Sequence, residues 1–363
     1  SIVTVTSDLA REQATAAAAR IAQGDPSPLL GVPVLLKDLI DVKGVVTTAG
    51  SRVLADNSAH RSADVWKRLE RAGAVLIGKA NTHEFAYGGT TEPTVNPWDT
   101  KRLVGGSSGG PAAALAAGLA PLAIGTDTAG SVRIPANLCG VYGLKPTNGA
   151  ISGRGVIPLA PTLDIVGPMG HSPADLATVM RAVGGPQRAT ATSLTLDKRI
   201  SRRLRLAYLD QPGPMSPGVE RAFNDTVAIA SQLGSAFPVP FDEFDRSVFV
   251  NFTLLGVEAV LVHEQWAAHR NQYSPYVRDR LEQAALTTAV DYERARRDAL
   301  RLRRTVDRAL RDADALIVPG VPFPAPRLGI TNVKVGRSDE DRDTAMCRNT
   351  GFANVTGHPA LAL

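Results

Sequence analysis

Short apolar runs alternate with amphipathic stretches along the first 170 residues of the chain. Runs such as P-V-L-L-K at 33–37 are bounded by turn residues, which indicates buried strands. Apolar residues spaced along one helical face, such as Val65 and Leu69, indicate helices, and Ser62 is placed to cap theirs. Helices are predicted over 11–23, 62–72 and 111–118, and strands over 31–40, 74–77 (ended by Gly78) and 121–125. This alternation predicts an α/β fold.

The pattern changes after about residue 172. We predict a helix over 173–183, a strand over 204–209, mostly helical structure over 217–312 and a strand over 316–319. Between Ala295 and Ala313, apolar residues recur at helical spacings. Eight arginines lie between Arg294 and Arg311, but six acidic residues between Asp291 and Asp314 are interleaved with them, which favours a solvated helix face over a nucleic-acid surface. No internal repeat and no linker between two domains is evident in the sequence.

Composition narrows the class of protein. The chain has 363 residues, of which 44% are hydrophobic and 21% charged, so it can bury a core and is not disordered. Its apolar runs are too short for the ~20 residues of a membrane span. Cys139 and Cys347 cannot form a disulfide framework, and with six scattered histidines they show no zinc spacing. We therefore expect no metal, no other cofactor and no membrane partner.

No signal peptide is visible at the start of this sequence. The chain lacks an initiator Met and a signal peptide, which makes a cytoplasmic location the expectation. Residues 360–363 read as an unfinished apolar strand, so the chain is expected to be incomplete at both ends.

Two glycine-rich loops carry serines. Residues 105–110 read G-G-S-S-G-G, and residues 125–131 read G-T-D-T-A-G-S. The helix between them rises about 12 Å, and the following strand returns about 16 Å. Both loops are therefore predicted at the same edge of the sheet. Glycines let backbone N–H groups approach a ligand, so this pair of loops indicates a catalytic site.

Each loop has alternative interpretations. A linker or a phosphate-binding loop is less favoured for the first, because a helix follows at once and no Lys-Ser/Thr ending is present. Residues 106–110 also fit G-x-S-x-G, the nucleophile elbow of α/β-hydrolases, with Ser108 as the nucleophile. That enzyme needs a downstream acid and histidine, and no histidine has a telling context. The candidates are His171, His263, His269 and His358. An aspartic-protease interpretation of Asp127 lacks the second Asp loop.

The run from 105 to 147 resembles the signature of the amidase signature family of serine hydrolases. It combines G-G-S-S-G-G, a small-residue helix, G-T-D-T-A-G-S-V-R-I-P-A and C-G-V-Y-G-L-K-P-T. Flanking pieces agree, namely P-V-L-L-K-D, G-K-A-N-T-H-E-F-A, N-P-W-D and the final N-V-T-G-H-P-A-L. The resemblance covers most of the chain and is weakest over 185–315.

The resemblance implies a Ser-Ser-Lys triad. In this sequence Ser131 is the implied nucleophile, Ser107 the bridging serine, held in a cis peptide, and Lys37 the base. The residues alone do not select this lysine, because Lys79 and Lys145 also follow apolar or glycine-rich segments; a structural role is favoured for those two. A lysine acts as a base only when neutral, which burial at the end of a strand promotes.

Further roles follow from the resemblance. Asp127 and Arg133 flank the nucleophile, where an ion pair that braces the loop is favoured over a chemical role. Ser108 is a supporting residue, and Tyr87 and Phe85 lie near the site or pack in the core. The backbone N–H groups that the resemblance assigns to an oxyanion hole are those of Thr128, Ala129, Gly130 and Ser131.

The implied fold is a single α/β/α domain with a large mixed central β-sheet flanked by helices, covering residues 1–363. We call residues 31–170 the signature core and residues 217–312 the helical region, which is expected to cover the sheet edge and shape the acyl pocket. The implied activity is hydrolysis of a linear carboxylic amide to an acid and ammonia or an amine, through an acyl-enzyme on Ser131. A general amidase is the expected subclass.

Three alternatives stay open. One is the A subunit of glutamyl-tRNA amidotransferase, and another is a carbamate, ester or allophanate-type hydrolase on the same scaffold. A non-catalytic binding protein is the third, against which the intact Lys37, Ser107 and Ser131 argue. The expected partner is a small-molecule amide, with no direct nucleic-acid contact and a possible homodimer.

Overall fold

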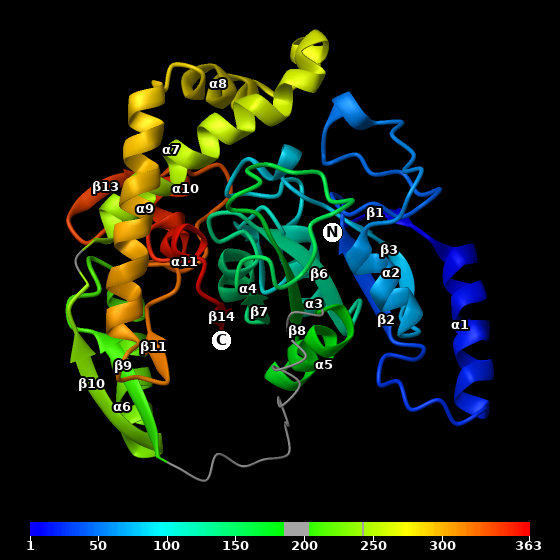
Figure 1. Cartoon of the computed structure of the whole chain (residues 1–363), viewed down its shortest axis with the longest axis horizontal. Coiled ribbons are helices and arrows are strands. Elements are labelled where there is room, and N and C mark those ends of the chain that lie inside the picture. The colour runs from blue at the N-terminus through cyan, green and yellow to red at the C-terminus, as the bar shows by residue number, and fades with distance from the viewer. Residues whose placement is uncertain (185–202, 242) are drawn as a thin grey trace.

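A seven-stranded mixed sheet forms the centre of the molecule (Figure 1). The computed structural model describes residues 1–184, 203–241 and 243–363. In the strand order β1-β3-β2-β6-β8-β7-β14, strands β3, β2 and β6 run parallel and the other neighbours pair antiparallel. The strands are β1 (Ile2–Val5), β2 (Pro33–Lys37), β3 (Val75–Ala80), β6 (Leu122–Asp127), β7 (Tyr142–Lys145), β8 (Ile165–Gly170) and β14 (Ala360–Ala362).

Helices cover both faces of this sheet. Successive side chains of a strand point to opposite faces, so Val34 and Leu36 of β2 pack in a cluster with α2 and α5. Leu35 packs in a separate cluster with α3 and α4. The helices around the sheet are α1 (Ser7–Ala22), α2 (Asp64–Arg71), α3 (Gly109–Ala116), α4 (Arg133–Cys139) and α5 (Pro173–Val183). The predicted α/β/α layering is confirmed.

A second, parallel sheet has the order β10-β9-β11 and lies beside α6 and α9 (Figure 1). Its strands are β9 (Leu204–Leu209), β10 (Gly234–Val239) and β11 (Ala315–Ile317). The helical region contains α6 (Pro217–Leu233), α7 (Phe244–His263), the 3₁₀ segment η4 (Glu264–Gln272), α8 (Pro275–Ala284) and α9 (Ala289–Ala309). The prediction of mostly helical structure therefore missed β10, whose short apolar run becomes a strand because β9 pairs along its whole length.

One helix meets the length and hydropathy of a membrane span. Helix α7 and η4 together, Asp245–Gln272, have a mean hydropathy of 1.3 in their most apolar window, and 56% of that window is buried inside the protein. A core helix meets the same measure of length and hydropathy, so this helix is weak evidence against the expectation of no membrane span. Helix α7 places Val250, Leu254 and Ala259 in the largest hydrophobic cluster, as a core helix of a globular protein does.

Two local predictions in the signature core are also wrong. Helix α2 begins at Asp64 after Ala63, and the Ser62 hydroxyl accepts from the N–H of Lys43 at 3.0 Å and does not cap the helix. Gly78 does not end β3, which continues to Ala80. A side chain at Gly78 would collide with the backbone of β1, so glycine there allows the two strands to approach closely.

The remaining elements are short. Their bounds are η1 (Arg52–Leu54), η2 (Glu84–Ala86), β4 (Val95–Asn96), β5 (Asp99–Leu103), β12 (Asn332–Val335), β13 (Ser338–Asp341), α10 (Arg342–Cys347) and α11 (Gly351–Thr356).

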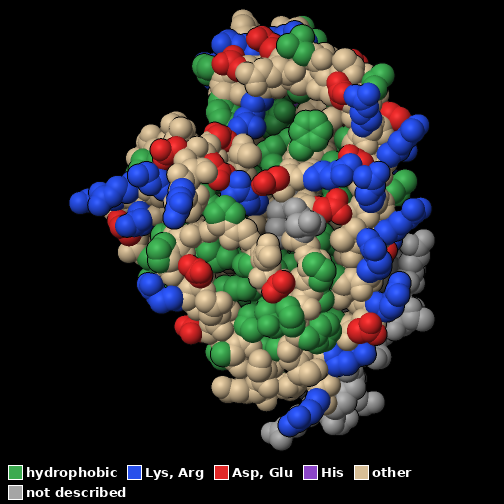
Figure 2. All heavy atoms as spheres, turned by 90° about the vertical axis from the view of Figure 1, so that its left-hand side faces the viewer, with side chains coloured by type: hydrophobic (Ala, Val, Ile, Leu, Met, Phe, Trp, Pro, Cys, Tyr) green, Lys and Arg blue, Asp and Glu red, His purple; other side chains and the backbone are tan. Residues whose placement is uncertain are grey.

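The charged face of α9 is solvated, as predicted. Arg294, Arg297 and Arg301 form ion pairs with acidic residues three or four positions away on the same helix. On the side of the molecule that carries α6, α9 and β10, basic and acidic side chains are interleaved (Figure 2).

Candidate active site

The two glycine-rich loops meet at the carboxyl end of β6. The first loop, before α3, contains the cis peptide bond Gly106–Ser107. The backbone N–H of Ser108 donates to the carbonyl of Ser131 in the second loop at 3.1 Å. Ser107 and Ser108 are fully buried, whereas Ser131 is 8% exposed. The prediction that the loops share one edge of the sheet is confirmed, and Ser131 is the most accessible of the three serines.

Lys37 lies at the end of β2, beside β6, and reaches the first loop. Its Nζ is 2.7 Å from Ser107 Oγ and 2.8 Å from Thr126 Oγ1, and it lies 3.5 Å from the carbonyl of Thr126. Burial lowers the pKa of Lys37 to about 7, although Asp127 and Asp164 oppose the shift. A neutral amine therefore forms near neutral pH next to a serine hydroxyl.

The other two candidate lysines have different partners. Lys79 Nζ forms a buried ion pair with Asp38 at 2.9 Å and bonds Thr47 Oγ1 at 2.9 Å. Lys145 Nζ donates to the carbonyl of Pro146 at 2.8 Å. These three contacts connect strand ends to neighbouring loops, which agrees with the structural role favoured for both lysines.

Ser108 is held by β6. Its hydroxyl donates to the carbonyl of Thr126 at 3.1 Å and accepts from the N–H of Thr126 at 3.3 Å. Two of the candidate histidines bond elsewhere: His263 contacts Tyr273 at 2.7 Å and His358 contacts Asp307 at 3.0 Å. These contacts favour a structural role for Ser108 over the nucleophile elbow.

Asp127 and Arg133 form the predicted ion pair, and it is buried. Nε and Nη2 of Arg133 donate to the two oxygens of Asp127 at 3.0 and 2.9 Å. Burial alone would raise the pKa of Asp127, but Arg133 and Asn354 bring it down to about 2. The carboxylate also accepts from the N–H groups of Gly130 and Val132, so one charged pair shapes the turn that carries Ser131.

Gly130 must be glycine in this turn. Its φ is +133°, and a Cβ would collide with the hydroxyl of Thr350. Its N–H donates to Asp127 at 2.9 Å. Of the four N–H groups predicted for the oxyanion hole, that of Gly130 is therefore bound inside the protein, which corrects the prediction at this residue.

Several polar residues that the sequence analysis missed contact the second glycine-rich loop, which carries Ser131. Asn354 donates to the carbonyl of Asp127 at 2.9 Å, Asn251 to that of Thr128 at 3.2 Å, and Thr350 to that of Ala129 at 2.6 Å. Thr126 and Asn354 lie within recognisable motifs, so a signal existed for them. Asn251 lies 123 positions from Thr128, on a helix without any motif, and nothing in the sequence pointed to it.

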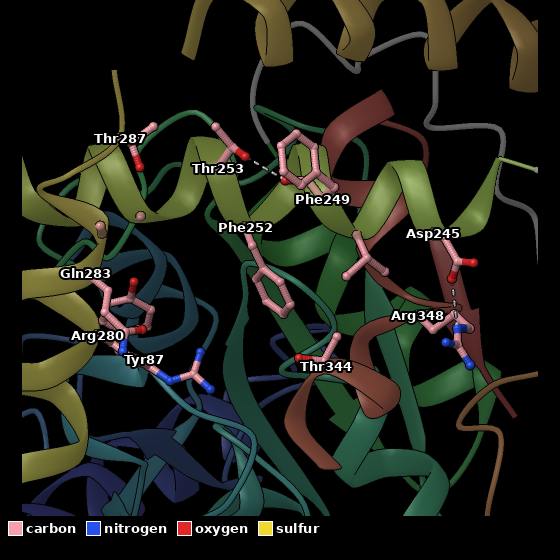
Figure 3. Close-up of a pocket in the computed structure, with 13 residues that line it drawn as sticks. Tyr87, Asp245, Phe249, Phe252, Thr253, Arg280, Gln283, Thr287, Thr344 and Arg348 are labelled. Carbon is pink, nitrogen blue, oxygen red and sulfur yellow. Dashed lines mark hydrogen bonds and ion pairs between the residues drawn. The ribbon is translucent and has the colours of Figure 1, made fainter. Parts of the chain in front are cut away.

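A pocket of about 530 Å³ opens between α7, α8 and α10 (Figure 3). Phe252 of α7 points into it, and Tyr87 and Arg280 lie together on one side. Tyr87 is three residues from Thr90, whose backbone packs against Gly106. Three residues of chain reach at most about 11 Å, so the pocket adjoins the first serine loop.

Arg280 brings a positive charge to this pocket. Its guanidinium is 3.9 Å from Asp343 and lies over the ring of Tyr276 at 4.6 Å. Asp343 pairs more closely with Arg342, at 2.8 Å. One carboxylate thus serves two arginines, and Asp341 also acts on the charge of Arg280.

The α/β/α sheet brings a buried lysine, a serine in a cis peptide and a second serine on a glycine turn to one edge. This fold and its relatives define the class as hydrolases that act on C–N bonds. The chain belongs to the Amidase family, whose sequence model matches residues 1–363.

Its relatives agree with this assignment. The chain is 35% identical to the A subunit of the glutamyl-tRNA(Gln) amidotransferase of Deinococcus radiodurans, covering 98% of this chain and 80% of the relative. It is 37% identical to AtzE, the 1-carboxybiuret hydrolase subunit of Pseudomonas sp. strain ADP, covering 98% and 81%. A solved complex that reveals the origins of an s-triazine catabolic enzyme superposes with a TM-score of 0.92 at 35% identity, covering 99% and 82%.

Proposed function

We propose that the chain hydrolyses a linear carboxylic amide through an acyl-enzyme on Ser131, with Lys37 as base and Ser107 as proton relay. The 2.7 Å contact between Lys37 Nζ and Ser107 Oγ carries the proposal. A neutral lysine has two N–H bonds and one lone pair. Thr126 offers Oγ1 and a carbonyl as acceptors, so the lone pair faces the Ser107 hydroxyl and can take its proton.

The proposed reaction has two stages. Ser107 takes the hydroxyl proton of Ser131 as it passes its own to Lys37, and Ser131 Oγ attacks the amide carbonyl. The oxyanion is bound by N–H groups of the second loop, for which we propose Thr128, Ala129 and Ser131. The proton returns through Ser107 to the leaving nitrogen, and the C–N bond breaks. Water then attacks the ester by the same relay and releases the acid.

We propose that the helical region supplies substrate selectivity. The pocket is lined by α7 and α8, and Phe252 and Tyr87 offer apolar contact for the acyl part. Arg280 favours a substrate with an anionic or strongly polar acyl end. A general amidase that acts alone is the first candidate.

A second candidate is a component of a larger, multi-chain enzyme. The relatives from Deinococcus radiodurans and Pseudomonas are both named as subunits. Co-purification from the native host, with activity that requires the partner chain, would favour this candidate; full activity of the purified chain would favour the first.

The experiment that tests the mechanism is covalent labelling. The protein is treated with a fluorophosphonate, and separately with a slowly hydrolysed amide, and the modified peptide is mapped by mass spectrometry. Modification of Ser131 by both reagents is expected. Modification of Ser108, or of no serine, would overturn the proposal. A panel of neutral, acidic and carbamate-like amides then defines the substrate.

A further inference from the structure

The loop that carries Ser131, which we call the nucleophile loop, is fixed by side chains from outside the signature core that bond its carbonyl groups. The carbonyls of Asp127, Thr128 and Ala129 accept hydrogen bonds from Asn354, Asn251 and Thr350, in that order. Asn354 and Thr350 lie at α11, and Asn251 lies on α7. Three successive peptide groups are thus oriented by side chains that approach from two helices.

The hydrogen bonds to these carbonyls also set the directions of the N–H groups in the same peptides. In a trans peptide the C=O and the following N–H point in opposite directions. The bond from Asn251 Nδ2 to the carbonyl of Thr128 therefore directs the N–H of Ala129 away from α7. The same amide lies 3.4 Å from the carbonyl of Gly351, so it connects the loop to the start of α11.

The buried side chain of Asn251 lowers the stability of the folded state. It is 1% exposed, and its Oδ1 has no hydrogen-bond partner among the described residues. A buried acceptor without a partner destabilises the folded state. An aliphatic side chain of similar size would avoid that cost, so what the asparagine provides is the donor on Nδ2.

The next residue along the helix lines the pocket. Phe252 points into the space beside Arg280 and Thr344 (Figure 3), while Asn251 holds the loop. Helix α7 therefore contacts both the pocket, through Phe252, and the peptide between Thr128 and Ala129, through Asn251.

We propose that Asn251 is a positioning residue, which aims the Ala129 N–H at the oxyanion and couples the substrate pocket to the oxyanion hole. The proposal rests on the proposed amide hydrolysis and extends it. Ground-state binding is not its main contribution, since Asn251 does not line the pocket.

The test compares Asn251→Leu with Asn96→Leu. Asn96 is a matched control, because it too is buried and its amide donates to two backbone carbonyls, those of Leu103 and Leu138. For Asn251→Leu we expect kcat to fall about ten- to a hundred-fold, with KM changed less than about threefold, because an oxyanion donor is misaimed. Fluorophosphonate labelling of Ser131 is expected to slow in parallel. Asn96→Leu is expected to lower Tm and leave kcat close to wild type.

The outcomes separate this inference from the proposed function. Wild-type kcat in a folded Asn251→Leu variant, or equal losses of kcat in both variants, would overturn the inference while Ser131 labelling still supported the mechanism. Should Asn251→Leu fail to fold, Asn251→Ala removes the same Nδ2 donor to the Thr128 carbonyl without adding a branched side chain to the buried site. It is expected to show the same loss of kcat at nearly constant KM, and an unchanged kcat would count against the inference.

Discussion

The signature core and the helical region use charge in opposite ways. In the signature core, Lys37, Lys79 and the pair of Asp127 with Arg133 are at most 5% exposed, and each is bound by specific partners. In the helical region, ion pairs such as Arg297 with Glu293 lie on a helix surface, with the side chains 77% and 46% exposed. Buried charge in the signature core is fixed by specific partners, whereas charge on the helix surface is solvated; we propose that only Arg280 of the helical region contributes selectivity.

The difference also explains which features had a sequence signature. Catalytic groups in the core depend on tight turns, so they come with glycines at fixed spacing, such as Gly130 beside Ser131. The role of a residue on a helix depends on where the fold places that helix. No local motif marks which residue of a turn will face the site. The predictions below test this contrast, beginning with the largest effect.

Ser131→Ala is expected to lower kcat by at least about 10⁴-fold, because the hydroxyl that forms the acyl-enzyme is lost. Steady-state turnover and mass spectrometry of the acyl-enzyme measure the effect. Ser108→Ala is the matched variant in the neighbouring loop, and it is expected to keep substantial activity because the Ser108 hydroxyl bonds the backbone of Thr126 and not the triad. A reversed pattern would support the nucleophile elbow.

Lys37→Met is expected to slow turnover about 10²- to 10⁴-fold at neutral pH, because the general base is removed. The wild-type enzyme gains activity as the pH rises through about 7, the pKa of Lys37, since only the neutral amine accepts a proton. A profile of kcat/KM against pH reports this limb. Lys79→Met is the control lysine on β3; an identical change in its pH profile would remove Lys37 from the role of base.

How far the sequence predicts this site follows from the same contrast. A strand that carries Lys37, the serine loops and the Asp127–Arg133 pair were predictable, because motif and turn chemistry specify them locally, although the predicted strand, 31–40, extended beyond β2 at both ends. The bond from the Gly130 N–H to Asp127 was not predictable, because it depends on the orientation of the Asp127 carboxylate in the folded protein. Strand β10 and the position of Asn251 were not predictable either, because pairing and helix packing between distant segments decide them.

Arg133→Leu is expected to destabilise the protein by about 3–5 kcal/mol, because Asp127 is left as a buried charge without its partner. Arg297→Ala on α9 is expected to change the unfolding free energy by less than about 0.5 kcal/mol. Urea denaturation of both variants gives the comparison. Similar losses of unfolding free energy in the two variants would mean that burial does not make the ion pair of the signature core more important for stability than the ion pair on α9. Restoration of stability in an Asp127→Asn, Arg133→Leu double variant would assign the loss to the unpaired carboxylate.

Arg280→Met is expected to have the smallest and most selective effect. It removes the positive charge beside Tyr87 and keeps most of the apolar side chain, so KM for an amide with an anionic acyl end should rise about tenfold, as loss of one charge-assisted contact implies. The kcat for a neutral amide should stay unchanged, because the triad is untouched. Arg278→Met on the same helix is the control, since Arg278 pairs with Asp279 outside the pocket. An equal rise in KM for neutral and anionic amides would show that Arg280 supports the shape of the pocket and does not select charge. The helical region would then act on the reaction only through packing.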